Sequence, residues 1–226
     1  MTLREVAIFR GLSEDALTRL EGECTWRTVR AKENIVHFQD QTRDVFILIE
    51  GRARVIIYSV TGRVVIFRDL GPGDMFGEFA PIDEKQRSAS VEALETCRVA
   101  CLAGAEFKKL LRHEPVVVRA LLDHAVGQIR ALTARVFEFS TLAVNNRIHA
   151  ELLRLAQGAT IDGRQARVSP FPTHLDIASR ISTHREAVTR ELNRLVKLGL
   201  IKREGGALVI KDMQRLARMV HDAVGD

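Results

Sequence analysis

The chain has 226 residues, 46% of them hydrophobic and 28% charged, which is enough for two small domains with cores of their own. Its three cysteines (Cys24, Cys97 and Cys101) are too few and too scattered for a disulfide framework, no apolar run approaches membrane-spanning length, and the N-terminus lacks a signal-peptide core, so we expect a cytoplasmic protein. Residues 1–143 carry 20 basic and 20 acidic groups and the remainder 14 and 9, so the net charge of +5 belongs to the C-terminal third and suggests a polyanion such as DNA as its partner. The alternative is a small basic domain without such a partner.

The first half of the chain predicts a short helix followed by a β domain. Ser13 is a suitable N-cap for a helix over residues 14–20. Short β-branched runs follow, many of them separated by glycines, at residues 45–49, 53–58, 64–67 and 90–100. Thr61-Gly62 is expected to form a hairpin turn, and residues 71–74 a broader turn. We predict a small barrel or jelly roll, in which the cysteines are buried apolar residues rather than metal ligands.

Residues 74–80 (DMFGEFA), followed by Arg87-Ser88-Ala89, are interpreted as a phosphate cradle. Gly77 lets a backbone come close to a ligand, Glu78 offers a carboxylate for a diol, and Arg87 supplies a planar fork that suits a phosphate. Taken singly, each residue also has an ordinary explanation as a turn glycine, a surface carboxylate or a surface ion pair.

A long helix is predicted to begin at Pro115, after a short one through Phe107, Leu110 and Leu111. Along it, apolar residues are spaced alternately four and three apart, which predicts a heptad seam between two copies of the chain. The seam residues are Val118, Leu122, Ala125, Ile129, Leu132, Val136, Phe139 and Ala143. The alternative is an amphipathic helix packed on its own barrel.

The C-terminal part predicts a winged helix-turn-helix. Asn145 or Asn146 is expected to cap a helix after a hinge at residues 144–146, and Gly158 to end it. Thr173 and Thr183 each begin a capping-box pattern, so two helices follow closely. Residues 200–203 and 207–210 then form a hairpin wing, and Asp212 caps a last helix.

The second of these two helices divides into a packing arc and a polar arc. Val188, Leu192 and Leu195 form the packing arc. The polar arc contains Arg185, Glu186, Thr189, Arg190 and Asn193. Arginine can pair with guanine and glutamate can accept from cytosine, so this arc is predicted to read DNA, with His184 or Lys197 at phosphates. Glu186 could instead only close the capping box at Thr183.

The cradle resembles the phosphate-binding cassette of cyclic-nucleotide-binding domains, and residues 185–190 (REAVTR) resemble the recognition helix of the CRP/FNR (catabolite activator) family. The first resemblance implies that Glu78 binds the ribose 2′-hydroxyl and that Arg87 and Ser88 bind the cyclic phosphate. The second implies that Thr133 touches the base, although Leu132 replaces a hydroxyl that often stands there. Pro81 and residues 83–86 also depart from the cassette pattern, and Ala187 and Thr189 from the recognition helix.

The resemblance covers nearly the whole chain and implies an α+β protein in three parts. These are an N-terminal β-roll (jelly roll) cyclic-nucleotide-binding domain over residues 1–114, a dimerisation helix over 115–143, and a C-terminal winged helix-turn-helix over 144–226. We expect a homodimeric transcription regulator, not an enzyme, controlled by cAMP or, second, cGMP. Palindromic double-stranded DNA and RNA polymerase are the partners that the resemblance implies, without a membrane. The alternatives are a redox or haem sensor, a non-responsive pocket, and a protein-interaction module. A redox or haem sensor would need a cysteine cluster or a Cys/His axial pair, and only the isolated Cys24 and His37 lie in that region.

Overall fold

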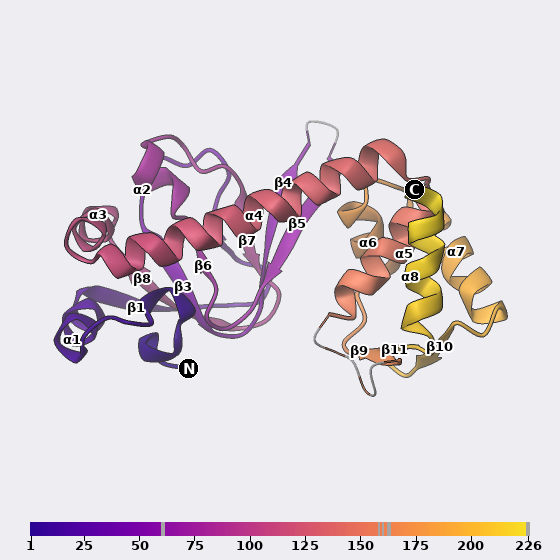
Figure 1. Ribbon diagram of the computed structural model, residues 1–226. Helices are drawn as coiled ribbons and strands as arrows, with labels where there is room; N and C mark the ends of the chain where they lie inside the picture. The colour runs from indigo at the N-terminus through magenta and orange to yellow at the C-terminus, as the bar shows by residue number, and fades with distance from the viewer. Residues whose placement is uncertain (60–61, 158, 160, 162–163, 225–226) are drawn as a thin grey trace. The chain divides into compact units, whose positions relative to one another are not determined.

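The computed structural model describes residues 1–59, 62–157, 159, 161 and 164–224 (Figure 1). Two of the expected features, the turn at Thr61 and the helix end at Gly158, lie outside the described residues. The chain divides into two compact units, Met1–Ile129 and Arg130–Asp226, and each is described by itself. None of the described helices is long and apolar enough to cross a membrane.

The first unit begins with two short 3-10 helices, η1 (Leu3–Glu5) and η2 (Ala7–Phe9), and the helix α1 (Glu14–Glu23). The expected cap is confirmed, because the Ser13 side chain accepts a hydrogen bond from the backbone N–H of Ala16 at 3.2 Å. Leu17 and Leu20, which lie at helical spacing, are buried on the inner face of α1. Helical spacing and a hydroxyl cap are therefore sufficient to locate this element.

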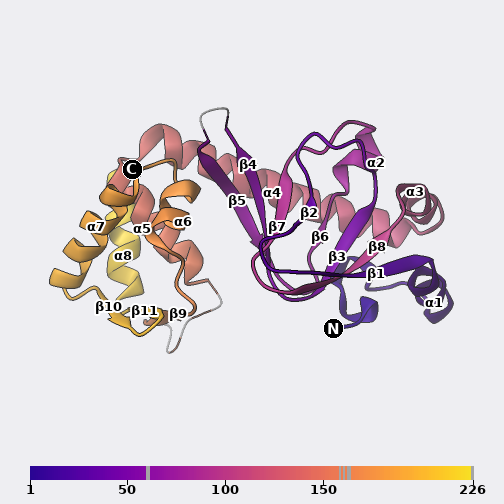
Figure 2. The same cartoon turned by 180° about the vertical axis from the view of Figure 1, so that it is seen from behind.

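Two antiparallel four-stranded sheets form the body of the first unit, which confirms the predicted jelly roll (Figure 2). One sheet has the order β1-β8-β3-β6, with strands Cys24–Val29, Cys97–Leu102, Val45–Glu50 and Met75–Phe76. The other has the order β2-β7-β4-β5, with strands Asn34–Val36, Ser90–Ala93, Ala53–Tyr58 and Val64–Leu70. β3 is almost entirely buried, as expected for a strand packed on both faces.

The run at residues 90–100 is not one strand, as the sequence suggested, but two strands in different sheets. The chain leaves β7 at Ala93 and enters β8 at Cys97. Between them it passes tightly over Gly51, where a Cβ would lie 2.5 Å from the Thr96 carbonyl oxygen and where φ is +89°. All three cysteines are buried in the core, as predicted, and burial raises the pKa of the Cys24 thiol to about 11.

Three helices complete or leave this unit. α2 (Phe79–Asp83) follows β6, α3 (Gly104–His113) packs Phe107 into the core, and α4 (Pro115–Thr141) begins with the expected proline. A proline is favourable in the first turn, since the N–H it lacks would have no helical partner there. α4 continues across the division between the two units.

The second unit is a winged helix-turn-helix. Its helices are α5 (Val144–Leu155), α6 (His174–Arg180), α7 (Arg185–Lys197) and α8 (Met213–Val224). The wing strands β10 (Ile201–Glu204) and β11 (Ala207–Ile210) pair as predicted, and β9 (Ala166–Val168), which the sequence analysis did not identify, adds a third strand. Asp212 caps α8 by accepting from the Arg215 N–H at 2.9 Å.

Two predicted caps are wrong. Ala143, extended at ψ 158°, is the N-cap of α5, so Asn145 and Asn146 already lie in its first turn. His184, not Thr183, is the N-cap of α7, and its side chain makes no cap bond. The Thr183 N–H, which the expected capping box would give to Glu186, instead bonds to the Ala178 carbonyl at 3.0 Å. The capping box at Thr173 and Asp176 is confirmed.

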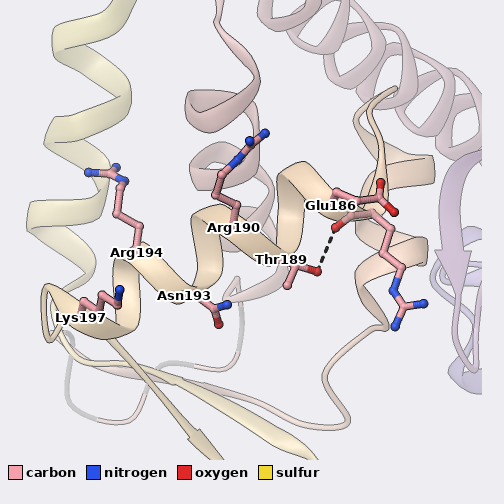
Figure 3. A pocket seen from close by; sticks show the side chains of 7 residues that line it. Glu186, Thr189, Arg190, Asn193, Arg194 and Lys197 are labelled. Atoms are coloured by element: carbon pink, nitrogen blue, oxygen red, sulfur yellow. Dashed lines mark hydrogen bonds between the residues drawn. The ribbon is translucent and has the colours of Figure 1, made fainter.

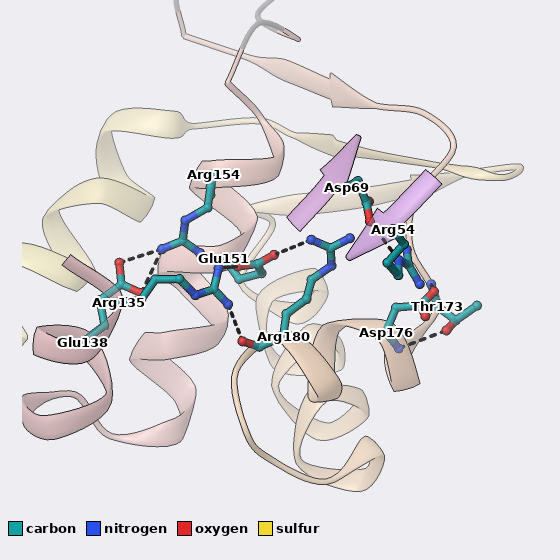
Figure 4. Close-up of polar contacts among 9 residues, drawn as sticks. All are labelled: Arg54, Asp69, Arg135, Glu138, Glu151, Arg154, Thr173, Asp176 and Arg180. Carbon is teal, nitrogen blue, oxygen red and sulfur yellow. Dashed lines mark hydrogen bonds and ion pairs between the residues drawn. The ribbon is translucent and has the colours of Figure 1, made fainter. Parts of the chain in front are cut away.

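A cluster of charged side chains joins the end of α4 to α5 and α6 (Figure 4). Glu151 on α5 is 1% exposed and forms ion pairs with Arg154, Arg135 and Arg180, the last two at 3.5 and 3.7 Å. Arg135 also donates to the Arg180 carbonyl, and Arg154 binds Glu138 at 2.6 Å. The break between α4 and α5, where a hinge was predicted, is therefore bridged by side chains on both sides.

Candidate functional site

The cradle is assembled where β6 passes into α2. Arg87, only 3% exposed, lies just before β7 and points back to this turn. Its Nε donates to Thr42 Oγ1 at 3.1 Å, and its terminal nitrogens donate to the carbonyls of Gly77 at 2.7 Å and Asp44 at 2.8 Å. A guanidinium has five N–H groups that can donate. Three of them bond to these acceptors among the described residues, which leaves two N–H groups for an anion.

Gly77 is required by the backbone and by Arg87. Its φ is +83°, a region that favours glycine, and a Cβ there would lie 2.9 Å from an Arg87 terminal nitrogen and 3.1 Å from the Asp44 carbonyl oxygen. The sequence predicted a close approach of the backbone at this position. The close neighbour that the structure identifies is the arginine of the same cradle.

Glu78 is 7% exposed and directly precedes α2. Burial raises the pKa of its carboxyl group, while a backbone hydrogen bond and the charges of Arg68, His124 and Arg87 act in the opposite direction. Burial likewise lowers the pKa of Arg87. The structure thus gathers Gly77, Glu78 and Arg87 around one turn.

Arg68 on β5 and His124 on α4 were not identified from the sequence. Arg68 donates to the Met75 carbonyl at 3.2 Å, and His124 lies 3.4 Å from Gln128 one turn along α4. Neither belongs to the cassette pattern, and only the fold brings their charges near Glu78. Of the remaining predicted residues, Ser88 follows Arg87 with an exposed side chain, and Thr133 lies on the part of α4 that belongs to the second unit.

The second candidate site is the outer face of α7, which forms an open hollow of about 790 Å³ (Figure 3). Seven side chains line it: Arg185, Glu186, Thr189, Arg190, Asn193, Arg194 and Lys197. The opposite arc packs inward, since Val188, Leu192 and Leu195 are fully buried. The division of α7 into a polar and a packing arc is confirmed.

Arg194, directly after Asn193, widens the predicted arc and was not singled out from the sequence. Its Nε donates to Glu191 Oε2 at 2.8 Å, and a terminal nitrogen donates to Oε1 at 2.7 Å. Glu191 in turn lies 2.5 Å from His149 Nε2 on α5. Helical periodicity alone could have placed Arg194 on this face, but not its contact with a glutamate that is itself buried.

α7 ends as predicted at a glycine. Gly199 takes φ +69°, and the N–H groups of Gly199 and Leu200 bond to the carbonyls of Val196 and Leu195, each at 3.0 Å. The turn before α7 has no glycine. Ser182 adopts the left-handed backbone conformation there, with φ +52°. The outer face of α7 is therefore fixed at both ends by defined turns.

A jelly roll with a phosphate cradle, followed by a winged helix-turn-helix with a basic outer face, is the architecture of a DNA-binding protein with a nucleotide-binding domain. Residues 26–114 match the cyclic nucleotide-binding domain family, and residues 146–219 match the Crp-like helix-turn-helix domain family. The chain belongs to the CRP/FNR family of transcription regulators.

Relatives cover most of the chain at low identity. The cAMP-activated global transcriptional regulator Vfr of Pseudomonas aeruginosa is 29% identical over 202 residues, 86% of this chain and 92% of that protein. A CRP-like cAMP-activated global transcriptional regulator of Mycobacterium tuberculosis is 25% identical over 96% of this chain and 97% of that one. These relatives are transcription regulators rather than enzymes.

Solved structures share the fold. A CooA mutant from Carboxydothermus hydrogenoformans has a TM-score of 0.81 at 18% identity and covers 97% of this chain and 96% of that one. A CRP-family transcriptional regulator from Thermus thermophilus has a TM-score of 0.70 at 27% identity, with coverage of 88% and 98%.

Proposed function

We propose that this protein is a homodimeric transcription regulator whose first unit binds cAMP and whose second unit then binds a palindromic operator. The observation that carries the proposal is the cradle. The buried carboxyl group of Glu78 offers a partner for a ribose diol. The buried Arg87 has two N–H groups that none of the described residues takes up, and these offer a partner for a cyclic phosphate.

cAMP is preferred to other effectors because the relatives from Pseudomonas and Mycobacterium are described as cAMP-activated. Ser88 and Thr133 are the hydroxyls proposed to lie near the phosphate and the base, and both could also serve a guanine amino group. cGMP is therefore the second candidate. A redox or haem effector is disfavoured, because burial keeps Cys24 a protonated thiol within the core.

The dimer is proposed from the exposed apolar side chains of α4. Leu122, Ile129, Leu132 and Val136 are all exposed within one chain, by 49 to 64%, and repeat at heptad spacing. Val126 and Phe137 widen this stripe. Apolar side chains in one continuous row on a helix are expected to be covered, and a second copy of the same helix covers them in register.

The DNA contacts are proposed for the outer face of α7. Arg185 and Arg190 would each select a G·C pair, as in the GTGA-type core that the family's matching residues read, and Glu186 would accept from a cytosine. Thr189 lies between them, and His184 is assigned to a phosphate. Two such helices in a dimer require half-sites about 10 to 11 base pairs apart. Membership of the family also makes RNA polymerase an expected partner.

The test is isothermal titration of the full chain with cAMP, cGMP and cyclic di-GMP, the last because a Xanthomonas campestris regulator of the same fold is described as responsive to it. We expect cAMP to bind more tightly than cGMP, by a modest factor. Arg87→Leu should abolish binding, and Arg87→Lys, which keeps the charge but not the fork, should weaken it. Lys85→Leu removes an exposed cation from the same loop and is the matched control.

Unchanged affinity in a folded Arg87→Leu protein would contradict the assignment of the cradle. A strong preference for cGMP or cyclic di-GMP would reverse the choice of effector. Specific DNA binding that no nucleotide alters would indicate a non-responsive pocket, and absence of DNA binding would favour a protein-interaction module.

A further inference from the structure

Thr189 stands in the middle of the outer face of α7, and its hydroxyl is held from two sides. Its Oγ1 donates to the Arg185 carbonyl one turn earlier at 3.0 Å, a bond drawn in Figure 3. His174 Nδ1, at the start of α6, lies 2.7 Å from the same oxygen. The hydroxyl has one hydrogen, which goes to Arg185, so the short contact with His174 must be a bond that Oγ1 accepts.

The contact at the other ring nitrogen of His174 favours one tautomer. A terminal nitrogen of Arg203, on the wing strand β10, lies 3.4 Å from His174 Nε2 and also donates to Asn193 Oδ1 at 3.4 Å. Arginine only donates, so Nε2 must accept, and the ring is neutral with its proton on Nδ1. The bonds then run in one direction, from Arg203 to His174 to Thr189 to the Arg185 carbonyl.

The charges around the ring favour the same state. Burial, Arg203 and Arg185 all lower the pKa of His174, in that order. A second proton would face two cations, one on the wing and one on α7, and would remove the acceptor that Arg203 uses. Asp176, in the same first turn of α6, is engaged with the Thr173 N–H at 3.2 Å in the capping box.

From this arrangement we infer that His174 is a positioning residue for DNA recognition, which commits the hydroxyl of Thr189 so that this residue reads DNA through its methyl group. The inference rests on the proposed role of α7. The hydroxyl has no hydrogen left to donate to a base, and one of its two lone pairs is taken by His174, which holds the oxygen toward α6. The methyl is the other branch at Cβ. The methyl group that DNA offers in the major groove is that of thymine, so Thr189 selects a thymine next to the positions of Arg185 and Arg190.

The experiment compares thymine with deoxyuridine, which lacks only the methyl group. An operator is first selected from random DNA with cAMP present, and each thymine of its half-site is then replaced singly by deoxyuridine. For the wild-type protein, one replacement should weaken binding by about 3- to 5-fold, the size expected for one buried methyl group. The same replacement should cost nothing in Thr189→Ser, which keeps the hydroxyl and loses the methyl, and should keep its cost in Thr189→Val.

Two histidine variants test the positioning role. His174→Ala releases the hydroxyl of Thr189 and should reduce the thymine preference, whereas His174→Asn places an amide N–H where Nδ1–H stood and should restore it. His184→Ala, at the exposed N-cap of α7, is the matched control and should lower affinity for all sequences without changing the preference.

The outcomes separate this inference from the proposed function. Three results would contradict recognition through the methyl group of Thr189. The selected palindrome could contain no thymine in its half-site, or it could be bound equally well with deoxyuridine at every position. The thymine preference could also persist in Thr189→Ser. A preference that His174→Ala leaves unchanged overturns the role of His174. Failure to select any palindrome overturns the assignment of α7 as the reader, and this inference with it.

Discussion

Glu78, which we propose as a ligand-binding residue, opposes folding while its carboxyl group is ionised. Its carboxyl group is almost fully buried, and burial is the main reason why its pKa lies above the ordinary value of 4.5. A raised carboxyl pKa means that the folded state holds the proton more tightly than the unfolded state. Ionised Glu78 therefore lowers the stability of the first unit at neutral pH, and this cost disappears as the pH falls through the raised pKa.

We predict that Glu78→Gln raises the free energy of unfolding by about 0.5 to 2 kcal/mol at pH 7 and strongly weakens cAMP binding. The amide keeps the shape of the side chain but is not charged. Trp26 is the single tryptophan and lies in the first unit, so urea unfolding followed by its fluorescence measures the change. Glu84→Gln, at an exposed glutamate whose pKa Lys108 lowers, should bring no gain. Equal stability of wild type and Glu78→Gln at pH 7 would contradict the argument.

His149 is a buried titratable residue in the second unit. Its Nε2 lies 2.5 Å from Glu191, and its Nδ1 has no partner among the described residues, which fits a neutral ring that donates from Nε2. Burial lowers the pKa of His149, against the raising effect of Glu191. Although burial alone would raise the pKa of Glu191, Arg194 and His149 lower it, so the carboxylate stays charged.

We predict that acid destabilises the second unit through His149. A lowered histidine pKa gives stability that is complete above the unfolded value of about 6.5 and is lost as the pH falls through the folded pKa. The wild-type protein should therefore lose more protection at α5 and α7 between pH 7 and pH 5 than His149→Gln, which still donates to Glu191 but does not titrate. Hydrogen exchange at these amides is the measurement, and parallel pH profiles of the two proteins would exclude His149 as the cause.

At the scale of elements, the charge cluster around Glu151 fixes the last turns of α4 to α5 and α6 (Figure 4). One nearly inaccessible carboxylate is shared by three guanidinium groups, of which Arg180 is also buried. Such a cluster is stabilising only when every charge has its partner. Removal of the carboxylate would leave the buried guanidinium groups unpaired and repelling one another.

We predict that Glu151→Gln destabilises the second unit by about 3 kcal/mol or more, the usual cost of breaking a buried pair. Hydrogen exchange at α5 should report the loss, while Trp26 fluorescence should show the first unit unchanged. Asp123→Asn removes one partner of the exposed Arg119–Asp123 pair on α4 and should cost less than about 0.5 kcal/mol. A similarly small effect at Glu151 would mean that the cluster does not bind these helices together.

The sequence predicted the elements better than their boundaries. Apolar periodicity located α1, α4 and both arcs of α7, since burial of one helix face leaves a direct trace in the residue order. The caps of α5 and α7 were mistaken because polar residues suited to a cap lay one to three positions from the backbone turn. The chain between β7 and β8 passes close to Gly51, and β9 is defined by its pairing with β11. Both features depend on residues distant in the sequence, so the residues next to them do not predict them.

At the scale of the whole molecule, the exposed stripe of α4 determines the expected assembly. We predict that Leu132→Glu gives a monomer, because like charges would meet across an apolar seam. Sedimentation of the nucleotide-bound protein is the measurement, and affinity for a palindrome should fall with the loss of the second reader. Ala134→Glu places the same charge on the opposite side of the helix and should leave the dimer intact. A dimer that persists in Leu132→Glu would show that the seam is misassigned.

The two candidate sites differ in how much of each could be predicted from neighbouring residues in the sequence. Gly77, Glu78 and Arg87 lie within eleven residues of one another and could be read as a motif. The contacts that hold Thr189 could not, because His174 and Arg203 are 29 positions apart and meet only when the wing folds beside α6. Periodicity in the sequence does not reveal side-chain contacts between distant segments. The sequence can indicate which residue is important, but these contacts determine how its side chain is oriented.

Ser182, in the left-handed turn before α7, has a consequence for which sequences this fold accepts. Glycine would relieve the strain there, but it would also give the unfolded chain more freedom, an opposing effect of about 0.4 to 1 kcal/mol. Since the two effects are similar in size, serine and glycine are nearly equivalent, and asparagine is tolerated as well. Valine or isoleucine would not be accepted, because a β-branched side chain is a true outlier at positive φ. Natural variation at this position should therefore be wide among small residues and end abruptly at branched ones.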